Sequence, residues 1–171
     1  MCGIVGYVGD KQASKFLLEG LNKLEYRGYD SAGIAVYNDE ADKIRVEKSV
    51  GRLAELEKKI DGNVPVGCMG IGHTRWATHG APSDWNSHPH TDCSGDFAVV
   101  HNGIIENYAE IKKRLEEKGM HFRSQTDTEV LVQLIEYIQT TRNVDLLTAV
   151  QVALHQVIGA YAVAVLNRNN P

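Results

Sequence analysis

The sequence predicts an α+β fold in which mainly antiparallel strands are covered by helices on the outside. The strand-like and helix-like runs do not alternate regularly, as they would in a doubly wound parallel fold. Two strand-like runs near the start are separated only by a short polar turn, which is typical of a hairpin. A polar stretch at 77–96 has neither helical nor strand periodicity, and loops of this length are usually functional.

Length and composition restrict the function classes. With 171 residues, 43% hydrophobic and 23% charged, the chain suits one domain or most of a larger one. A net charge of -4 without clustered Lys and Arg predicts no nucleic-acid partner. No apolar run reaches membrane-spanning length, so no membrane partner and a cytoplasmic location are expected. Three cysteines without CxxC spacing suggest neither a disulfide framework nor a thiolate zinc site.

The first half of the chain is expected to form several strands and two helices. The opening run CGIVGYV is short and apolar, as in a buried strand. Asp10 is expected to cap a helix that continues to about Tyr26, because apolar residues recur there at helical spacing. The runs GIAVY and KIRVEK follow as a hairpin, a short helix spans about Leu53 to Ile60, and CMGIGHTRW forms another strand.

In the second half of the chain, the strand FAVVHNGII comes directly after the polar loop. Asn107 and Glu110 then resemble a capping box, which opens a helix that ends at Gly119. Two further helices, TDTEVLVQLIEYI and NVDLLTAVQVALHQV, and a last strand, GAYAVAVL, complete the pattern. The chain stops at NRNNP directly after that strand, where a returning strand is expected, so the sequence suggests a domain truncated at its C-terminus.

The opening MCGIVG places Cys2 beside the amino terminus. One interpretation is an inert thiol that packs as a small hydrophobe. In the other, removal of Met1 gives Cys2 a free α-amino group with a pKa of about 7.7–8.0. That amine can act as the base for its own thiol, which makes Cys2 a candidate nucleophile.

Four further residues are candidates for binding a substrate. Attack on an amide generates an oxyanion, for which Asn102 and Gly103 offer a side-chain amide and an unobstructed N–H. An Asn-Gly pair is also a common turn, and this alternative stays open. Arg75 suits a bidentate grip on a carboxylate, although a surface ion pair is the alternative. Asp127 is either a helix cap or a ligand for an ammonium group.

Five histidines fall within one third of the sequence, so a zinc or iron site must be considered. No HEXXH motif is present, and no pair has the i, i+4 spacing that places two imidazoles on one helix face. The sequence therefore predicts no metal. The five are His73, His79, His88, His90 and His101.

Six motifs, taken together and in this order, resemble the N-terminal glutaminase domain of the glutamine-fructose-6-phosphate aminotransferase family. They are MCGIVG, LEYRGYDSAG, GHTRWATHG, HPH, HNGIIEN and TDTEV, and they span essentially the whole chain. The related amidophosphoribosyltransferase glutaminase domain shares the opening cysteine and HNG. Its pattern differs where this chain has YRGYD, TRWATHG and HPH.

The resemblance implies a fold and a set of roles. The fold would be that of an N-terminal nucleophile hydrolase, a four-layer αββα sandwich. Cys2 would be the nucleophile, with Asn102 and Gly103 as the oxyanion hole. Arg75 would bind the carboxylate of glutamine and Asp127 its amino group. The loop that covers the substrate would contain Trp76, Thr78 and His79, and no cofactor is implied.

The resemblance also implies what lies outside this chain. Residues 1–171 would be an incomplete glutaminase domain, without the sugar-isomerase domains through which fructose 6-phosphate would be bound and glucosamine 6-phosphate made. The parent enzyme would be a homo-oligomer. Besides the amidophosphoribosyltransferase alternative, two other classes stay open: a glutamine-binding module without catalysis, and a metal-dependent hydrolase that uses the histidines.

Overall fold

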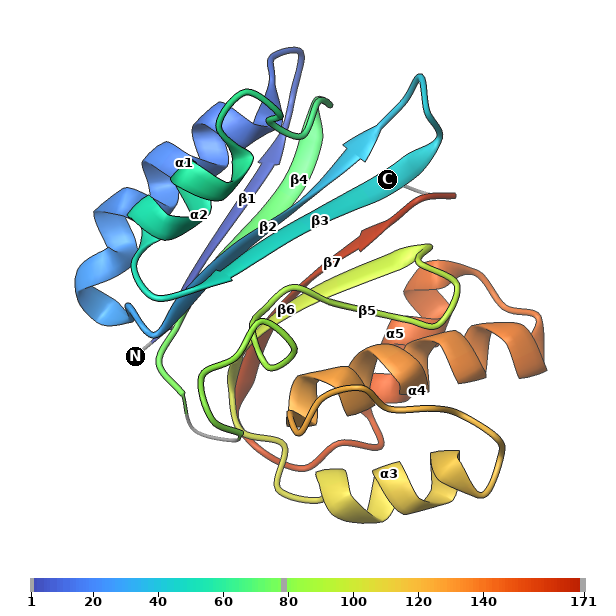
Figure 1. Ribbon diagram of the computed structural model, residues 1–171. Coiled ribbons are helices and arrows are strands. Elements are labelled where there is room, and N and C mark those ends of the chain that lie inside the picture. Colours follow the sequence, from blue (N-terminus) through green and yellow to red (C-terminus); the bar gives the residue numbers. More distant parts are fainter. Residues whose placement is uncertain (1, 78–79, 170–171) are drawn as a thin grey trace.

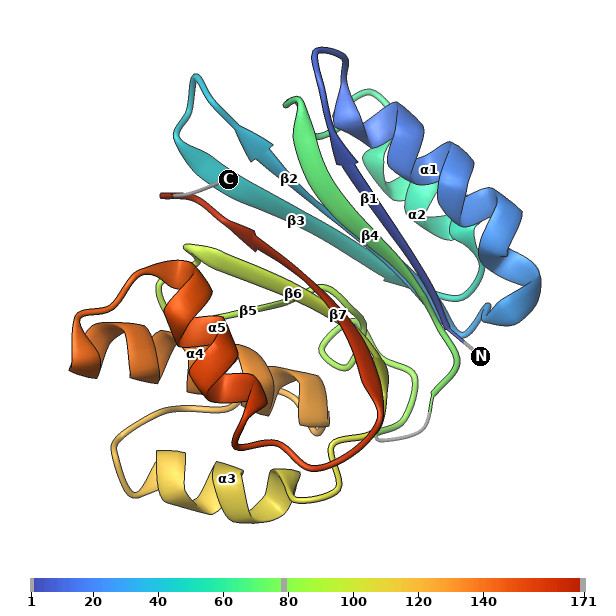
Figure 2. The ribbon, with the colours of Figure 1, turned by 180° about the vertical axis from the view of Figure 1, so that it is seen from behind.

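Two antiparallel sheets lie face to face, and helices cover their outer sides (Figures 1 and 2). The structure is a computed structural model that describes residues 2–77 and 80–169. One sheet has the order β1-β4-β2-β3 and the other the order β5-β6-β7. The strands are β1 (Gly3–Val8), β2 (Ser31–Asn38), β3 (Lys43–Val50), β4 (Met69–Arg75), β5 (His90–Thr91), β6 (Phe97–Gly103) and β7 (Tyr161–Asn167).

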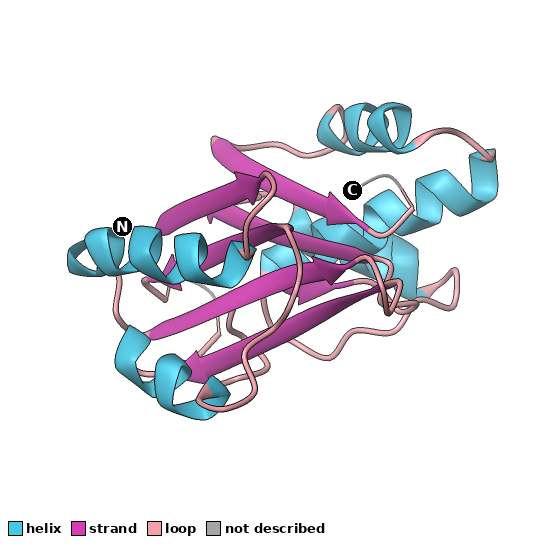
Figure 3. Ribbon diagram, turned by 90° about the horizontal axis from the view of Figure 1, so that it is seen from above, coloured by secondary structure: helices cyan, strands magenta, loops and turns pink. Residues whose placement is uncertain are grey.

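The helices form the two outer layers. Seen from above, the strands run through the middle of the molecule with helices outside them (Figure 3). The first sheet is covered by α1 (Ala13–Leu24), the 3-10 turn η1 (Glu25–Arg27) and α2 (Leu53–Ile60). The second is covered by α3 (Tyr108–Glu116), α4 (Asp127–Arg142) and α5 (Leu146–Leu154). This α-β-β-α order confirms the expected α+β sandwich.

The interior has three hydrophobic clusters, one between each sheet and its helices and one between the two sheets, because side chains alternate between the two faces of each strand. On β2, Ile34 and Val36 pack against α1 and α2, whereas Ala35 points to the opposite sheet. The contact between the sheets is made by small and medium side chains, including Ala98 and Val100 of β6. A shift of one residue in any of these strands would exchange the two faces, so the pattern fixes the register.

Several boundaries differ from the sequence expectation. Asp10 does not cap the first helix: α1 begins at Ala13, after Gln12, without a side-chain cap. The helix start is instead held by tertiary contacts, because the N–H of Ala13 donates to the carbonyl of Gly67. The loop at 77–96 is also not free of strand, because it contains β5, which pairs with β6.

The second helical region shows a similar difference at its start. Asn107 stands at the N-cap position of α3, but its side chain makes no cap bond. Its Nδ2 donates to the carbonyl of Gln156, and its Oδ1 accepts from the N–H of Ile158. The helix ends at Glu116, three residues before Gly119. In the described part of the chain, no helix is both long enough and apolar enough to cross a bilayer.

Candidate active site

The antiparallel pairing of β1 and β4 brings the start of the chain to the end of β4. Gly3 pairs with Thr74, so Cys2 lies opposite Arg75. The Sγ atom of half-buried Cys2 accepts a hydrogen bond from the Trp76 N–H at 3.2 Å. The thiol is also placed to donate a hydrogen bond, because its Sγ lies 3.6 Å from the Trp76 carbonyl oxygen. The thiol is therefore held at one edge of the first sheet.

The second sheet brings Asn102 to the same place. Its Nδ2 donates to the carbonyl oxygen of Cys2 at 3.3 Å, although 100 residues separate them in sequence. Asn102 and Gly103 are the last residues of β6 and pair with Ala162 and Tyr161. The alternative interpretation as a turn is therefore wrong. The φ of Gly103 is 125°, and a Cβ there would lie 2.2 Å from the Ala160 carbonyl oxygen, so only glycine fits.

Arg75 is a buried cation at the end of β4. It is 4% exposed, so it does not occupy the surface position of the alternative interpretation. Its Nη2 donates to the carbonyl oxygen of Gly80 at 3.1 Å. Burial lowers the pKa of Arg75, and the nearby Cys2, Asp30 and Asp127 oppose that shift. Its guanidinium thus lies close to the other candidate residues and is desolvated.

The segment after Arg75 is fixed by Asp30. The Asp30 carboxylate accepts from the Ala77 N–H at 2.8 Å, and its own N–H donates to the Arg75 carbonyl oxygen. Trp76 is 46% exposed and meets Tyr29 edge to face, with the ring centroids 5.6 Å apart. Thr78 and His79, expected in the covering loop, lie outside the described residues.

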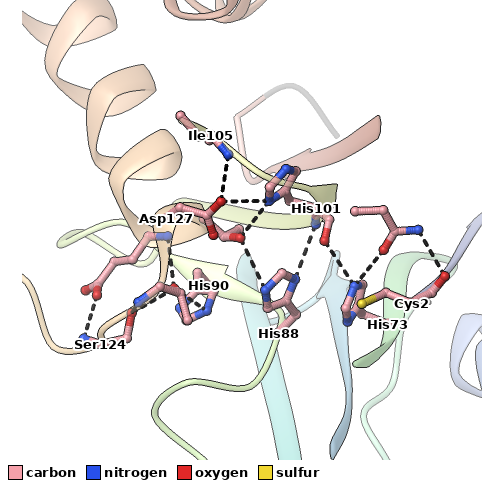
Figure 4. Close-up of polar contacts among 12 residues, drawn as sticks. Cys2, His73, His88, His90, His101, Ile105, Ser124 and Asp127 are labelled. Atoms are coloured by element: carbon pink, nitrogen blue, oxygen red, sulfur yellow. Dashed lines mark hydrogen bonds and ion pairs between the residues drawn. The ribbon is translucent and has the colours of Figure 1, made fainter. Parts of the chain in front are cut away.

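Asp127 is the first residue of α4 and is 5% exposed. It is not the helix cap, because Thr126 takes that role and accepts from the Glu129 N–H. The Asp127 Oδ2 accepts from the Ile105 N–H at 2.9 Å and lies 4.0 Å from His101 Nδ1 (Figure 4). The carboxylate is therefore anchored next to the end of β6.

Four of the histidines converge between the sheets and form a buried imidazole cluster. The ring of His88 lies 4.1 Å from that of His73, 5.0 Å from His90 and 6.5 Å from His101, between centroids. Burial lowers the pKa of His73 to about 3 and moves the pKa values of His88 and His90 well below the usual range. Among the described residues, no group of three His, Cys, Asp or Glu could hold a metal.

Several of the imidazole nitrogens instead bond to protein groups. His88 Nδ1 accepts from the His101 N–H, and its Nε2 lies 3.2 Å from Thr128 Oγ1. His90 Nε2 lies 3.0 Å from Thr126 Oγ1. These contacts join the loop before β6 to the first turn of α4 (Figure 4).

The structure thus brings together Cys2, Arg75, Trp76, Asn102 and Gly103, with Asp127 anchored nearby. Sequence reasoning missed that His73 Nε2 lies 2.9 Å from Asn102 Oδ1, since it treated His73 only as a possible metal ligand. The available signal was strand periodicity: His73 stands two residues before Arg75 and so shares its face of β4.

Known proteins resemble this chain over its whole length. The sequence model of the family described as "Glutamine amidotransferase domain" matches residues 73–171. A glutamine-fructose-6-phosphate aminotransferase (isomerizing) from Bacteroides thetaiotaomicron is 56% identical over 171 residues. That match covers 100% of this chain and 28% of the relative. The aminotransferase of the same name from Thermus thermophilus is also 56% identical, over 99% of this chain and 27% of its own length.

Solved structures agree in fold. The glutamine phosphoribosylpyrophosphate amidotransferase from B. subtilis, complexed with ADP and GMP, has a TM-score of 0.83 and 27% identity. It is matched over 98% of this chain and 35% of that one. A structure described as the allosteric regulatory enzyme of purine biosynthesis has a TM-score of 0.85 and 29% identity, over 98% of this chain and 36% of that one. The chain therefore spans little more than a quarter of the curated relatives and about a third of these structures.

Proposed function

This chain belongs to the glutamine amidotransferase domain family, and from that premise we propose that it hydrolyses glutamine to glutamate and ammonia with Cys2 as the nucleophile. The observation that carries the proposal is the meeting of Cys2 with Asn102 from the opposite sheet. A thiol close to a side-chain amide donor suits nucleophilic hydrolysis of an amide, and a buried guanidinium one strand away suits a substrate that carries a carboxylate.

The first half of the reaction forms a thioester. After removal of Met1, the free α-amine of Cys2 takes the thiol proton, and the thiolate attacks the carboxamide carbon of glutamine. The resulting oxyanion would be stabilised by Asn102 Nδ2 and the Gly103 N–H. The C–N bond then breaks as the α-ammonium group returns its proton to the leaving nitrogen, which departs as ammonia.

The second half hydrolyses the thioester. The same amine accepts a proton from water while the water oxygen attacks the acyl carbon. The C–S bond breaks, glutamate leaves, and the proton returns to the thiolate. One residue therefore supplies both the nucleophile and the base, and no oxidant or metal enters the balance of the reaction.

Arg75 and Asp127 would hold the two charged groups of the substrate. Arg75 is desolvated, so a bidentate bond to the glutamine α-carboxylate would form in a region of low dielectric constant. Asp127 would face the α-ammonium group from the start of α4. Trp76, Thr78 and His79 would belong to the segment that covers the substrate.

We further propose the fate of the ammonia. The relatives that are 53–56% identical are named for the transfer from glutamine to fructose 6-phosphate, whereas the amidophosphoribosyltransferase is only 27% identical. The ammonia would therefore serve to form glucosamine 6-phosphate, in parts of the protein beyond the length matched here. We place this protein in the cytoplasm, as a homo-oligomer.

The test is ammonia release from glutamine by the full-length protein. Cys2→Ala should lower the rate at least about a thousandfold, because the nucleophile is lost. Cys93→Ala, which removes an exposed thiol elsewhere, is the matched control and should retain the normal rate. A normal rate in Cys2→Ala would end the proposal. Glutamine binding without any ammonia release by the unmodified protein would instead identify a binding module.

A further inference from the structure

His73 stands directly behind the side chain of Asn102. Its Nε2 lies 2.9 Å from Asn102 Oδ1 and 3.1 Å from the main-chain oxygen of His101. In Figure 4, His73 is the member of the imidazole cluster that is drawn next to Cys2. His73 and Asn102 come from different sheets, so this contact joins the two halves of the site across the interface.

The partners of His73 define where its proton is. Both atoms next to Nε2 are oxygens, and the His101 carbonyl oxygen can only accept, so Nε2 carries the hydrogen and donates. His73 is 1% exposed and its pKa is about 3, so the ring is neutral at working pH and has one N–H. That hydrogen is shared between Asn102 and His101.

The same contacts define which way the Asn102 amide points. With Oδ1 toward His73, Nδ2 faces the Cys2 carbonyl oxygen at 3.3 Å. The reversed amide would place Oδ1 against that carbonyl oxygen and the NH2 group against the Nε2 hydrogen of His73. Both contacts would then be repulsive, so His73 and Cys2 select the same orientation.

We propose that His73 is a positioning residue, whose Nε2–H holds the Asn102 carboxamide with its NH2 group toward Cys2. This inference rests on the proposed oxyanion role of Asn102. Without the bond, only the 3.3 Å contact with the Cys2 carbonyl oxygen would select the orientation, and the amide would more often direct its oxygen at the developing oxyanion, which would repel it. The donor would then be absent in a large fraction of molecules.

The surrounding cluster fixes His73 in turn. The His101 carbonyl oxygen is the second acceptor of its hydrogen, and the His101 N–H donates to His88 Nδ1. The His88 ring also stacks on His73, with 4.1 Å between centroids. His88 reaches Thr128 in the first turn of α4. The orientation of the Asn102 amide thus depends on a buried network, in which burial holds the pKa values of His73 and His88 far below the usual range.

The test uses a variant that keeps the donor and two that lose it. The Nε2 of a glutamine can occupy the place of the imidazole Nε2, whereas asparagine is too short and leucine has no donor. His73→Leu and His73→Asn should lower kcat for glutamine hydrolysis about 10–100-fold, with KM within about threefold. His73→Gln should recover most of that loss. Because the Asn and Gln variants are both polar, their comparison holds even where His73→Leu does not fold.

His90→Leu is the matched control, because His90 is equally buried but bonds to Thr126 rather than to Asn102. It should lower stability without the loss of kcat. In the background of Asn102→Ala, His73→Asn should have little further effect on kcat, since its partner is already gone.

Three results separate the claims. Full activity in Cys2→Ala would overturn the proposed function. An unchanged kcat in Asn102→Ala would overturn the oxyanion role. If Asn102→Ala is slow but His73→Asn and His73→Gln have the same kcat, or if the His73 and Asn102 losses simply multiply, then His73 is not the positioning residue.

Discussion

Asn102 and Arg75 would act at different stages of the reaction, and kinetics can separate them. Asn102→Ala removes a donor to the transition-state oxyanion, so kcat should fall on the order of 10²–10³-fold. Arg75→Ala removes a contact made equally in the ground and transition states, so KM should rise more than kcat falls. Steady-state measurements with glutamine check this. Equal effects of both variants on both constants would contradict the assignment.

The buried histidines should make the fold sensitive to acid. In the folded protein, burial holds the pKa of His73 at about 3 and lowers those of His88 and His90. In the unfolded chain they bind protons below about pH 6.5. Stability is therefore complete above that pH and falls as pH decreases from 6.5 toward 3. Each imidazole contributes a slope of up to about 1.4 kcal/mol per pH unit.

Urea unfolding at several pH values measures this slope. His73→Gln should make the loss of stability with falling pH less steep, because one of the buried imidazoles is gone. His121→Gln, at an exposed position, serves as the control and should leave the slope as it was. A stability that is constant between pH 7 and pH 5 would contradict the account.

At the scale of single residues, the sequence predicts which side chains could take part in the chemistry, but not the contacts that orient them. Cys2, Arg75 and Asn102 could be chosen because their side-chain chemistry suits a role by itself. The orientation of the Asn102 amide could not, since it depends on His73, which lies in another sheet and 29 residues away. The partner of Asp127, the N–H of Ile105, was hidden for the same reason.

At the scale of elements, Gly33 shows why β2 and the loop before β5 pack so closely. A Cβ at Gly33 would lie 2.1 Å from the His88 carbonyl oxygen, which belongs to the backbone. Gly33→Ala should therefore lower the free energy of unfolding by about 2 kcal/mol or more, because one of the two backbones must move. The shift would also displace His88 in the imidazole cluster.

Gly6→Ala is the control for this strand position. A Cβ at Gly6 would meet nothing within 4 Å, so the substitution should be neutral or slightly stabilising. Denaturant unfolding of the two variants measures the difference. Similar stabilities for both would show that the close approach at Gly33 has no energetic cost.

Element positions were predictable where periodicity is local. The helix expected from Leu53 to Ile60 has those bounds, because its buried face can be read from the sequence. Asp10 as a cap was wrong because the first turn of α1 is satisfied by Gly67, a tertiary neighbour. β5 was missed because two residues give no alternation, and its pairing with β6 defines it.

At the scale of the whole molecule, the distance between nucleophile and oxyanion donor depends on how the sheets pack. Cys2 directly precedes β1 of the first sheet, Asn102 lies on β6 of the second, and Ala98 is fully buried between the two sheets. Ala98→Leu should lower stability by about 1–3 kcal/mol and also lower kcat, because it forces the sheets apart.

Ala54→Leu adds the same side chain at an exposed position of α2, on the outer side of the first sheet. It should change neither stability nor kcat appreciably. Unfolding and steady-state kinetics on both variants make the comparison. An Ala98→Leu protein with normal kcat would show that the spacing of the sheets does not control the site.

The layered arrangement was predictable only in part. The order of elements excluded a regular parallel fold and indicated antiparallel strands with helices outside. The division into two stacked sheets came from the resemblance of six motifs to a family, because no local pattern shows which strands share a sheet. The structure and the family match confirm that expectation.

The most direct test of the central claim is the rate of ammonia release when the α-amine of Cys2 is no longer free. Inserting a lysine between Met1 and Cys2 prevents removal of the methionine and leaves the thiol intact but its nitrogen in a peptide bond. Mass spectrometry establishes which N-terminus each protein carries. The account predicts that the unmodified protein starts at Cys2 and is active, and that the extended protein releases ammonia at least about a hundredfold more slowly. Equal rates in the two proteins would contradict it.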